Sequence, residues 1–361
     1  GELRLCGDYR PVNKYIRAIP LAMPDIHERI RALVGYSLFA ELDWATAFHQ
    51  LPLDEISSKR LAISTPFGLY APAFVPEGIM VGSALLMEIV YQIFSDYDWL
   101  IAVHDNLLIG AKSPEDLMHK VELVLTRCRE KNIQIKLKKS QFGVTKITFF
   151  GYVIEDGKYG IAAERIEDIQ DIPFGKNLKE VQRFLGLATF VSPFVPNYAD
   201  QFRHIFKMST KDFTFVEDTW EGLDYKEEWN KAKGHLLKTC SVYFPDRTLE
   251  WVLKTDASNT GFGAALIQMM PAERLTAEER AQAYSQGLVT QDGFVPVPIA
   301  LVSKAFSPQA QKWSVTEQEL FAIIHALKKL ENLLILKPFI LETDHLNIVA
   351  LADGSIALSK R

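Results

Sequence analysis

The alternation of apolar and polar positions in the first third of the chain predicts short strands that pack against amphipathic helices. Leu38, Ala40 and Leu42 lie on one face of an expected strand over residues 36–43, and Asp43 falls at its end. Segments with a helical period come before and after this strand. Helices mixed with antiparallel strands indicate an α+β fold.

Capping residues set the boundaries of several further elements. Asp25 and Ser113 are expected to cap the helices that follow them. Asn177 and Glu180 form an Asn-x-x-Glu pair that can cap another helix reciprocally. The expected helices are 26–34, 83–94, 114–131, 178–190 and 315–330, and the expected strands are 60–65, 69–74, 100–103, 107–110, 133–137, 147–154, 249–255, 261–268, 298–303 and 339–343.

The pattern of elements predicts three structural parts. Residues 1–173 form a first α+β domain, and residues 174–246 form a small helical connector. In residues 247–361 two hairpin strands precede a polar stretch, a strand, a helix and a further strand, which indicates an α/β domain.

The composition is that of an ordinary globular protein with more than one core. The chain has 361 residues, of which 48% are hydrophobic and 24% charged. Its cysteines, Cys6, Cys128 and Cys240, are odd in number and far apart, so we expect reduced thiols rather than disulfides or a metal site. No apolar stretch is long enough to cross a membrane, and the first residues lack a signal-peptide core, so we expect an intracellular protein.

The charge balance is slightly acidic, opposite to that of a typical nucleic-acid-binding protein. Forty Lys and Arg against 45 Asp and Glu give a net charge of -5. A nucleic-acid partner would therefore need a local basic segment, and the alternative for such a segment is a solvated helix end. The strongest candidate comprises Arg127, Arg129, Lys131, Lys136, Lys138 and Lys139.

Two aspartates are candidates for a metal site. Asp43 ends the strand over 36–43, and Asp105 with Asn106 is expected to form the tight turn of a hairpin, because both residue types tolerate a left-handed backbone. Paired carboxylates can hold the divalent cations of a two-metal phosphoryl-transfer site. The alternative is that both residues only end a strand or form a turn.

A series of motifs resembles, in order and spacing, the reverse transcriptase and RNase H of Gypsy-class long-terminal-repeat retrotransposons. The resemblance covers nearly the whole chain. The motifs are LRLCGDYRPVNK (3–14), LFAELDWATAFHQLPL (38–53), PFGLYAPAFVPEG (66–78), VHDNLLIG (103–110), IKLKKSQFG (135–143), FFGYVI (149–154), LKEVQRFLGLATFVSPFVPNY (178–198), KTDASNTGFGAALIQ (254–268), WSVTEQELFAIIHALKK (313–329) and FILETDH (339–345).

For the first domain, the resemblance implies partial fingers and a palm. Asp43 matches the first metal-binding aspartate, and Asp105 matches the first aspartate of the Tyr-x-Asp-Asp turn. Phe48 matches the aromatic residue that screens the 2′-hydroxyl of the incoming nucleotide, and Arg4 matches a fingers arginine that holds the triphosphate. The residues alone favour a core aromatic for Phe48 and a surface residue of an edge strand for Arg4.

Two positions depart from the family pattern. The Tyr-x-Asp-Asp turn reads Val-His-Asp-Asn, so Asn106 replaces a carboxylate, although its carbonyl oxygen can still bind a metal. Glu77 stands before Gly78, where it would place an acid near the triphosphate. The upstream fingers segment, with another triphosphate-binding residue, is expected to be missing.

For the last domain, the resemblance implies a two-metal nuclease in which Asp256, Glu319 and Asp344 bind the metals. Without it, Glu319 could be a favourable charge at a helix N-terminus and Asp256 a turn residue. His345 matches the family sequence Thr-Asp-His, yet a lone histidine is more often structural. We expect this domain to lack a C-terminal segment, and the polar stretch 270–295 to be a surface insertion.

The resemblance implies an RNA-directed DNA polymerase with a fused RNase H. The connector would be its thumb, the cofactor would be Mg²⁺ or Mn²⁺, and the substrates would be an RNA/DNA template-primer and a dNTP, with no membrane. The alternative is a catalytically impaired, retroelement-derived structural or binding subunit with protein partners in a larger assembly. The departures at Asn106 and Glu77 favour that alternative.

Overall fold

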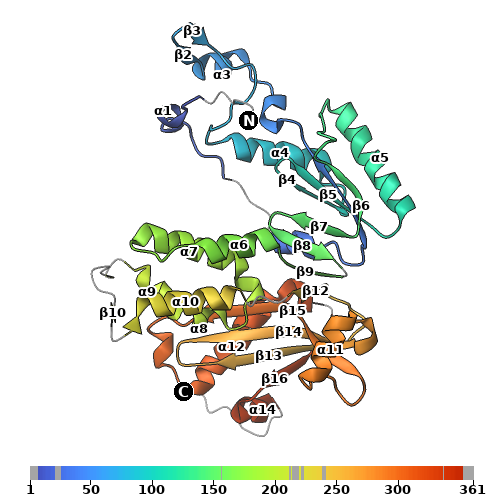
Figure 1. The fold of residues 1–361 in the computed structure, drawn as a ribbon, viewed down its shortest axis with the longest axis vertical. Coiled ribbons are helices and arrows are strands. Elements are labelled where there is room, and N and C mark those ends of the chain that lie inside the picture. The colour runs from blue at the N-terminus through green and yellow to red at the C-terminus, as the bar shows by residue number, and fades with distance from the viewer. Residues whose placement is uncertain are drawn as a thin grey trace. The chain divides into compact units, whose positions relative to one another are not determined.

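The computed structural model describes residues 7–20, 26–155, 157–210, 213, 219–220, 223–237, 241–335 and 337–352. The chain divides into two compact units, Gly1–Ile147 with Glu155–Gly157, and Thr148–Ile154 with Lys158–Arg361 (Figure 1). The expected connector falls within the second unit, and the division into three parts stays a prediction. The mixture of helices and antiparallel sheets confirms the α+β prediction.

The first unit is built around a four-stranded sheet in the order β4-β5-β1-β6. Its elements are α1 (Arg10–Asn13), α2 (Ile26–Arg31), β1 (Leu38–Asp43), η1 (Ala47–Gln50), α3 (Glu55–Arg60), β2 (Ile63–Thr65), β3 (Gly68–Tyr70), α4 (Gly82–Phe94), β4 (Leu100–Val103), β5 (Asn106–Ala111), α5 (Pro114–Glu130), β6 (Gln141–Val144) and the start of β7 (Lys146–Phe149).

The core of this unit lies between the sheet and helices α4 and α5. Ala40 and Leu42 of β1 are fully buried, as their alternation predicts, and they share one cluster with Val90 of α4 and with Val124 and Cys128 of α5. Burial raises the pKa of the Cys128 thiol to about 11, so this cysteine is an inert core residue. The other two cysteines lie outside the described residues.

The predicted helix caps hold where the structure describes them. The Ser113 hydroxyl accepts a hydrogen bond from Asp116 N at 3.2 Å at the start of α5. Asn177 Oδ1 accepts one from Glu180 N at 3.0 Å, and Glu180 Oε1 in return accepts from Asn177 Nδ2 at 2.7 Å, so the expected reciprocal pair forms. Glu180 Oε2 also accepts from Lys176 N at 2.7 Å. Asp25 lies outside the described residues.

Two predicted strands of this region are wrong. The segment 133–137 forms only an isolated bridge between Ile135 and Trp44, because the chain turns after Lys136, whose N–H donates to Asp43 O. The strand that pairs with β1 is instead β6. The segment 147–154 splits into β7 and β8, because Phe150 and Gly151 adopt positive φ angles of 50° and 82°.

The prediction also misses short elements with weak hydrophobic periodicity. Asp54 accepts hydrogen bonds from Ile56 N and Ser57 N and caps α3, so Arg60 ends a helix where a strand was expected. Strands β6 and β9 are unpredicted as well, because their short length leaves too few alternating positions for the sequence to distinguish them from loops. Helix α6 is also unpredicted, although its apolar residues gather on one face.

The second unit combines a helical layer with two four-stranded sheets, β12-β9-β8-β7 and β15-β14-β13-β16. Its elements after β7 are β8 (Tyr152–Glu155), β9 (Lys158–Ile161), α6 (Ala163–Asp171), α7 (Leu178–Val191), η2 (Ser192–Phe194), α8 (Tyr198–Gln201), α9 (Arg203–Met208), β10 (Thr219–Trp220), β11 (Leu223–Asp224), α10 (Tyr225–Leu236), β12 (Val242–Tyr243), β13 (Trp251–Ala257), β14 (Gly261–Pro271), η3 (Ala272–Arg274), α11 (Ala277–Ser285), β15 (Phe294–Ala305), η4 (Ala310–Lys312), α12 (Val315–Lys329), α13 (Glu331–Leu334), β16 (Ile340–Thr343) and α14 (Leu346–Ala352).

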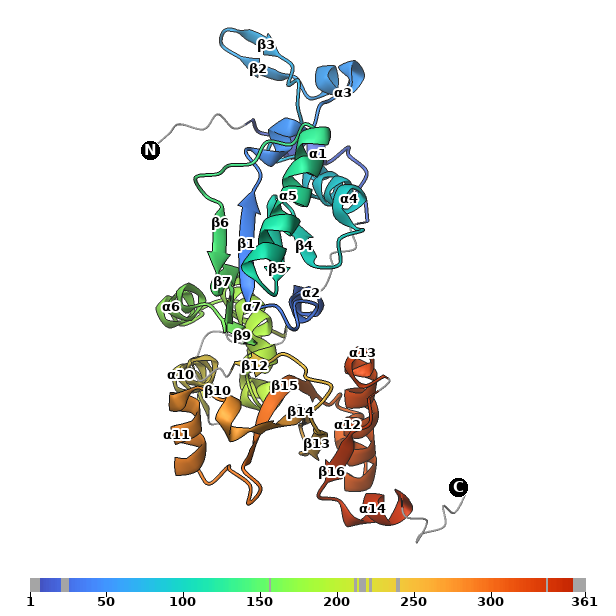
Figure 2. The ribbon, with the colours of Figure 1, turned by 90° about the vertical axis from the view of Figure 1, so that its right-hand side faces the viewer.

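Helix α12 covers one face of the sheet β15-β14-β13-β16 (Figure 2). Leu253 of β13, Leu266 of β14 and Ile299 of β15 point to this face and pack with Ala326 and Leu330 of the helix. Strand β13 pairs antiparallel with β14 and parallel with β16. Because a shift of one residue would turn the buried side chains of β13 away from α12, the register of β13 with both neighbouring strands is fixed.

The polar stretch 270–295 is less of a surface loop than predicted. Met270 and Val295 are buried, because β14 and β15 extend into the stretch as a hairpin. Helix α11 lies between these two strands in sequence. Its capping-box residue Glu279 also accepts hydrogen bonds from Lys158 and from the Tyr243 hydroxyl. Burial alone would raise the pKa of Glu279, but these donors and Thr276 outweigh it and lower the pKa to about 2.

No helix in the described part of the chain is both long and apolar enough to span a lipid bilayer.

Substituting Glu279→Gln is expected to lower the free energy of unfolding by about 1–2 kcal/mol at pH 7, because it removes the charge from a hydrogen-bonded carboxylate but keeps an acceptor. The pKa of Glu279 is about 2 in the folded chain, against about 4.3 for an unperturbed glutamate. Its stabilising effect is therefore complete above the unfolded pKa and is lost as the pH falls toward the folded pKa.

Denaturant unfolding of the wild type and the variant from pH 7 down to pH 3 measures this effect. The exposed neighbour Glu278 provides the control, Glu278→Gln. The difference between wild type and Glu279→Gln should shrink as the pH falls, and a constant difference would contradict the assignment.

Candidate active sites

In the first unit, the ends of β1 and β5 bring three predicted metal ligands side by side. Asp43 pairs with Asn106 across the two strands, and Trp44 N donates to Asp105 O at 2.8 Å. The Asp43 side chain is 18% exposed, and Lys139 Nζ lies 3.9 Å from its Oδ2. The basic segment thus reaches the carboxylate at the strand end.

The turn between β4 and β5 is tight, as predicted, but its left-handed residue is His104. His104 has a φ of 52°, whereas Asp105 and Asn106 were expected to take this conformation. The His104 N–H donates to Met87 Sδ of α4 at 2.9 Å, which holds the turn against the helix. Asn106 Nδ2 donates a long hydrogen bond of 3.5 Å to Asp105 Oδ1, so an uncharged amide lies beside this carboxylate at the position where the resemblance implies a second acid.

Glu41 is an acidic neighbour that the sequence analysis missed. It precedes Asp43 by one alternation of β1 and therefore lies on the same face. Burial, and then the charge of Asp43, raise the pKa of Glu41. The signal in the sequence was the Glu-x-Asp spacing within a strand.

Phe48 lies in η1, half-buried against the core of the first unit. A Cβ added at Gly82, in the first turn of α4, would lie 3.4 Å from the Phe48 ring and 3.2 Å from Ile79 Cγ2. A glycine at this position therefore lets α4 approach the ring closely.

The loop of the predicted nucleotide-binding residues Glu77 and Gly78 is held by a residue that the analysis missed. Asn13 Nδ2 donates to Gly78 O at 3.0 Å, and Asn13 Oδ1 accepts from Met80 N at 2.9 Å. Gly78 has a φ of 93°, which requires a glycine, and Glu77 is exposed. Arg4 lies outside the described residues.

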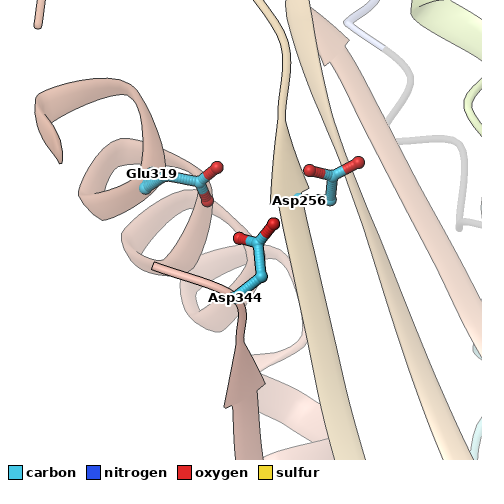
Figure 3. Close-up of side chains that lie close together, drawn as sticks. All are labelled: Asp256, Glu319 and Asp344. Atoms are coloured by element: carbon cyan, nitrogen blue, oxygen red, sulfur yellow. The ribbon is translucent and has the colours of Figure 1, made fainter. Parts of the chain in front are cut away.

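In the second unit, three acidic residues from separate segments meet. Thr255 of β13 pairs with Thr343 of β16 in parallel, so Asp256, near the end of β13, and Asp344, directly after β16, lie at the same end of the two strands. Glu319 reaches them from α12, whose start is fixed by a capping box between Ser314 and Glu317. One carboxylate oxygen of each acid lies within 4.8 Å of the other two (Figure 3).

The electrostatics of these three carboxylates differ. Asp256 and Asp344 are exposed, whereas Glu319 is 3% exposed. Ala257 N donates to Glu319 Oε1 at 3.1 Å, and Glu319 Oε2 is buried without a hydrogen-bond partner in the part of the chain that the structure describes. Burial raises the pKa of Glu319, the hydrogen bond from Ala257 opposes this, and the charges of Asp344 and Asp256 raise it further.

His345 lies beside this site. Its ring Nε2 lies 3.2 Å from Thr316 Oγ1, and its backbone N–H donates to Thr343 Oγ1 at 3.3 Å. These contacts attach the end of β16 to the start of α12.

This set of oxygens fits a divalent cation. Hard cations take carboxylate ligands. A buried carboxylate oxygen that lacks a hydrogen bond and lies near two other acids destabilises the fold unless a cation binds it. A pocket of about 720 Å³ adjoins Asp256 and Asp344 and leaves room for a ligand. In the first unit, by comparison, the candidate ligands are two carboxylates, Asp43 and Asp105, and the amide of Asn106. They also offer oxygen atoms, but with one negative charge fewer than three acids.

Comparisons with known proteins match both units. Residues 1–154 match the family described as "Reverse transcriptase (RNA-dependent DNA polymerase)", and residues 246–360 match "RNase H-like domain found in reverse transcriptase". Proteins of these two families generally use divalent metals.

Relatives of known origin align with almost the whole chain. The retrovirus-related Pol polyprotein from transposon 297 of Drosophila melanogaster is 26% identical over 96% of this chain and 30% of its own length. The transposon Tf2-7 polyprotein of Schizosaccharomyces pombe is 25% identical over 97% of this chain and 25% of its own length. The chain thus spans less than a third of each polyprotein.

Solved structures share the fold. A foamy viral protease-reverse transcriptase in complex with dsDNA has a TM-score of 0.75 and 21% identity, over 97% of this chain and 68% of that one. A second structure of that protein, in complex with an RNA/DNA hybrid, has a TM-score of 0.70 and 21% identity, over 98% of this chain and 45% of that one. The chain therefore belongs to the reverse transcriptase and RNase H region of long-terminal-repeat retrotransposon polyproteins.

Proposed function

We propose that this chain copies RNA into DNA and cleaves the RNA strand of the resulting hybrid. The observation that carries this proposal is the meeting of Asp256, Glu319 and Asp344 from three separate segments. The substrates would be an RNA/DNA template-primer and a dNTP, and the cofactor Mg²⁺ or Mn²⁺. The complexes of the foamy viral protein with dsDNA and with a hybrid support nucleic acid as the partner.

In the nuclease site, Asp256, Glu319 and Asp344 would hold the cation. A divalent cation bound there would polarise the scissile phosphate and lower the pKa of an attacking water. Glu319 supplies a ligand oxygen whose position is fixed, because its other oxygen is hydrogen-bonded to Ala257 N. Asp256 and Asp344, which are exposed, face the solvent from which a nucleic-acid backbone would approach.

In the polymerase site, Asp43, Asp105 and the Asn106 carbonyl oxygen would be the ligands. Phe48 would screen the 2′-hydroxyl of the nucleotide and Arg4 would hold its triphosphate. The loop of Glu77 and Gly78 would lie beside the nucleotide. The exposed Glu77 would repel the triphosphate there, so nucleotide binding should be weaker than in a chain with a neutral residue at this position.

The second candidate is a catalytically impaired subunit that acts by binding in a larger assembly. The amide of Asn106 beside Asp105 favours it, because the polymerase site has lost one of its negative charges. The meeting of the three acids Asp256, Glu319 and Asp344 disfavours it. We therefore expect hybrid cleavage to be the more robust of the two activities.

Hybrid cleavage is expected in the presence of Mn²⁺, which accepts the same oxygen ligands as Mg²⁺. Asp256→Asn should reduce it by about a hundredfold or more, because an amide replaces a charged metal ligand. The assay follows an end-labelled RNA/DNA hybrid at rising Mn²⁺, with Asp246→Asn, in the loop before β13, as the control. Equal cleavage by wild type and Asp256→Asn would refute the assignment of the site.

Primer extension on an RNA template should be abolished by Asp43→Ala or Asp105→Ala. Asn106→Asp should preserve or increase it, because the substitution restores a negative charge for cation binding. The exposed Asp98→Asn serves as a control for loss of an acid in the same unit. Unchanged extension in Asp43→Ala would rule out the polymerase assignment.

Binding of an RNA/DNA hybrid should depend on the basic segment that reaches Asp43. Charge reversal of Lys136, Lys138 and Lys139 is expected to weaken binding and to flatten its salt dependence by about 0.9 in the log–log slope for each phosphate that the protein no longer neutralises. Fluorescence anisotropy at salt concentrations from about 50 to 200 mM measures both, because phosphate binding changes affinity by orders of magnitude over this range. A slope identical to that of the wild type would assign the segment to a solvated helix end.

A further inference from the structure

A segment of the connector, residues 197–200, lies directly on the sheet that carries Asp256. Ala199 N donates to Ser303 Oγ of β15 at 2.9 Å, and the same hydroxyl donates to Phe262 O of β14 at 3.2 Å. The Ser303 side chain thus joins the connector to two strands of the sheet.

The contact falls on the row of residues to which Asp256 belongs. Asp256 of β13 pairs with Gly263 of β14, and Gly263 pairs with Ser303 of β15, so the three side-chain positions point to one face. A Cβ added at Gly263 would overlap the carboxamide oxygen of Asn197. The connector therefore occupies the space that a side chain next to Asp256 would fill, and Asn197 lines the same pocket as Asp256 and Asp344.

A further contact holds the turn that follows Asp256. Thr260 Oγ1 donates to Asp200 Oδ1 at 2.8 Å, and Ser258 N donates to Gly261 O at 2.8 Å within the turn. Ala257, between Asp256 and this turn, donates its N–H to Glu319. A shift of the turn would move both Asp256 and the donor that orients Glu319.

The burial of these contacts indicates which of them matter most. Asp200 also pairs with Arg203 at 3.3 Å, but both side chains are 48% exposed, so this ion pair contributes little. The bond between Ala199 and Ser303 is partly buried, and the packing of Asn197 on Gly263 allows no added atom. Ser303 is therefore the first side chain to test. Thr260 is the second, because its bond to Asp200, although exposed, ties the turn after Asp256 to a segment that is distant in sequence.

We propose that the connector segment 197–200 is a positioning element of the nuclease site, which holds the Asp256 strand and its turn through Ser303, Gly263 and Thr260. The proposal rests on the proposed nuclease function. It makes Ser303 and Thr260 positioning residues, since neither is among the three acids that would hold the cation. Small displacements of a ligand-bearing strand are costly for metal binding and catalysis.

The experiment compares the double variant Thr260→Val/Ser303→Ala with the wild type in two assays. One is the Mn²⁺ binding, measured by titration, that disappears on Asp256→Asn. The other is cleavage of an RNA/DNA hybrid. The double variant is expected to need about tenfold more Mn²⁺ for half-saturation and to lose about tenfold in kcat, with KM for the hybrid unchanged.

Two controls separate positioning from general stability. Thr248 donates its hydroxyl to Asp246 Oδ1 at 2.6 Å in the loop before β13, on the side of the strand away from Asp256 in sequence, so Thr248→Val should leave Mn²⁺ binding unchanged. The conservative double variant Thr260→Ser/Ser303→Thr keeps both hydroxyls and should therefore bind Mn²⁺ as tightly as the wild type. If the valine–alanine double variant proves unstable, the single variants Thr260→Val and Ser303→Ala should each show a smaller shift in the same direction.

Wild-type Mn²⁺ affinity in the double variant, or an equal loss in Thr248→Val, would overturn the positioning role. Failure of the wild type to cleave, with Mn²⁺ binding intact, would refute the proposed activity alone, because the binding assay still tests the positioning role. A wild type that binds no Mn²⁺ at Asp256 would overturn both.

Discussion

Parallel pairing of β13 with β16 is the constraint on which the nuclease site depends. The register that sets Thr255 opposite Thr343 places Asp256 and Asp344 at one sheet edge, although a hairpin, the insertion with α11 and the helix α12 separate them in sequence. The same sheet buries Leu253 against α12, and this packing brings Glu319 to the edge. The packing of the sheet against α12 therefore also determines where the three acids lie.

The two candidate sites distribute their charge differently. In the proposed nuclease site, three acids lie together, and the buried Glu319 has an oxygen without a hydrogen-bond partner among the described residues. A cation there would compensate both the repulsion and the desolvation. In the polymerase site, Asn106 supplies a neutral amide beside Asp105, and Lys139 already lies near Asp43. A bound cation would consequently relieve less electrostatic repulsion at the proposed polymerase site.

The sequence predicted those features that depend on interactions between residues close together in the chain. Ser113 and Asn177 cap helices because their side chains reach the nearby N–H groups, and the alternation of Ala40 and Leu42 defines a buried face. The motifs also located the three nuclease acids, whose convergence the structure then provides. The sequence could not show that His104, rather than Asp105 or Asn106, takes the left-handed conformation, because all three residue types tolerate it and a tertiary contact with Met87 of α4 holds His104 in place.

The most direct test of the central claim, that Asp256, Glu319 and Asp344 form a cation site, is a crystal structure of the protein soaked in Mn²⁺, with anomalous diffraction data. The account predicts an anomalous peak within bonding distance, about 2.0–2.3 Å, of an oxygen of each acid, and a hydrogen bond retained between Ala257 N and Glu319. An ordered site with no anomalous peak at saturating Mn²⁺, or a peak that excludes Glu319, would contradict it.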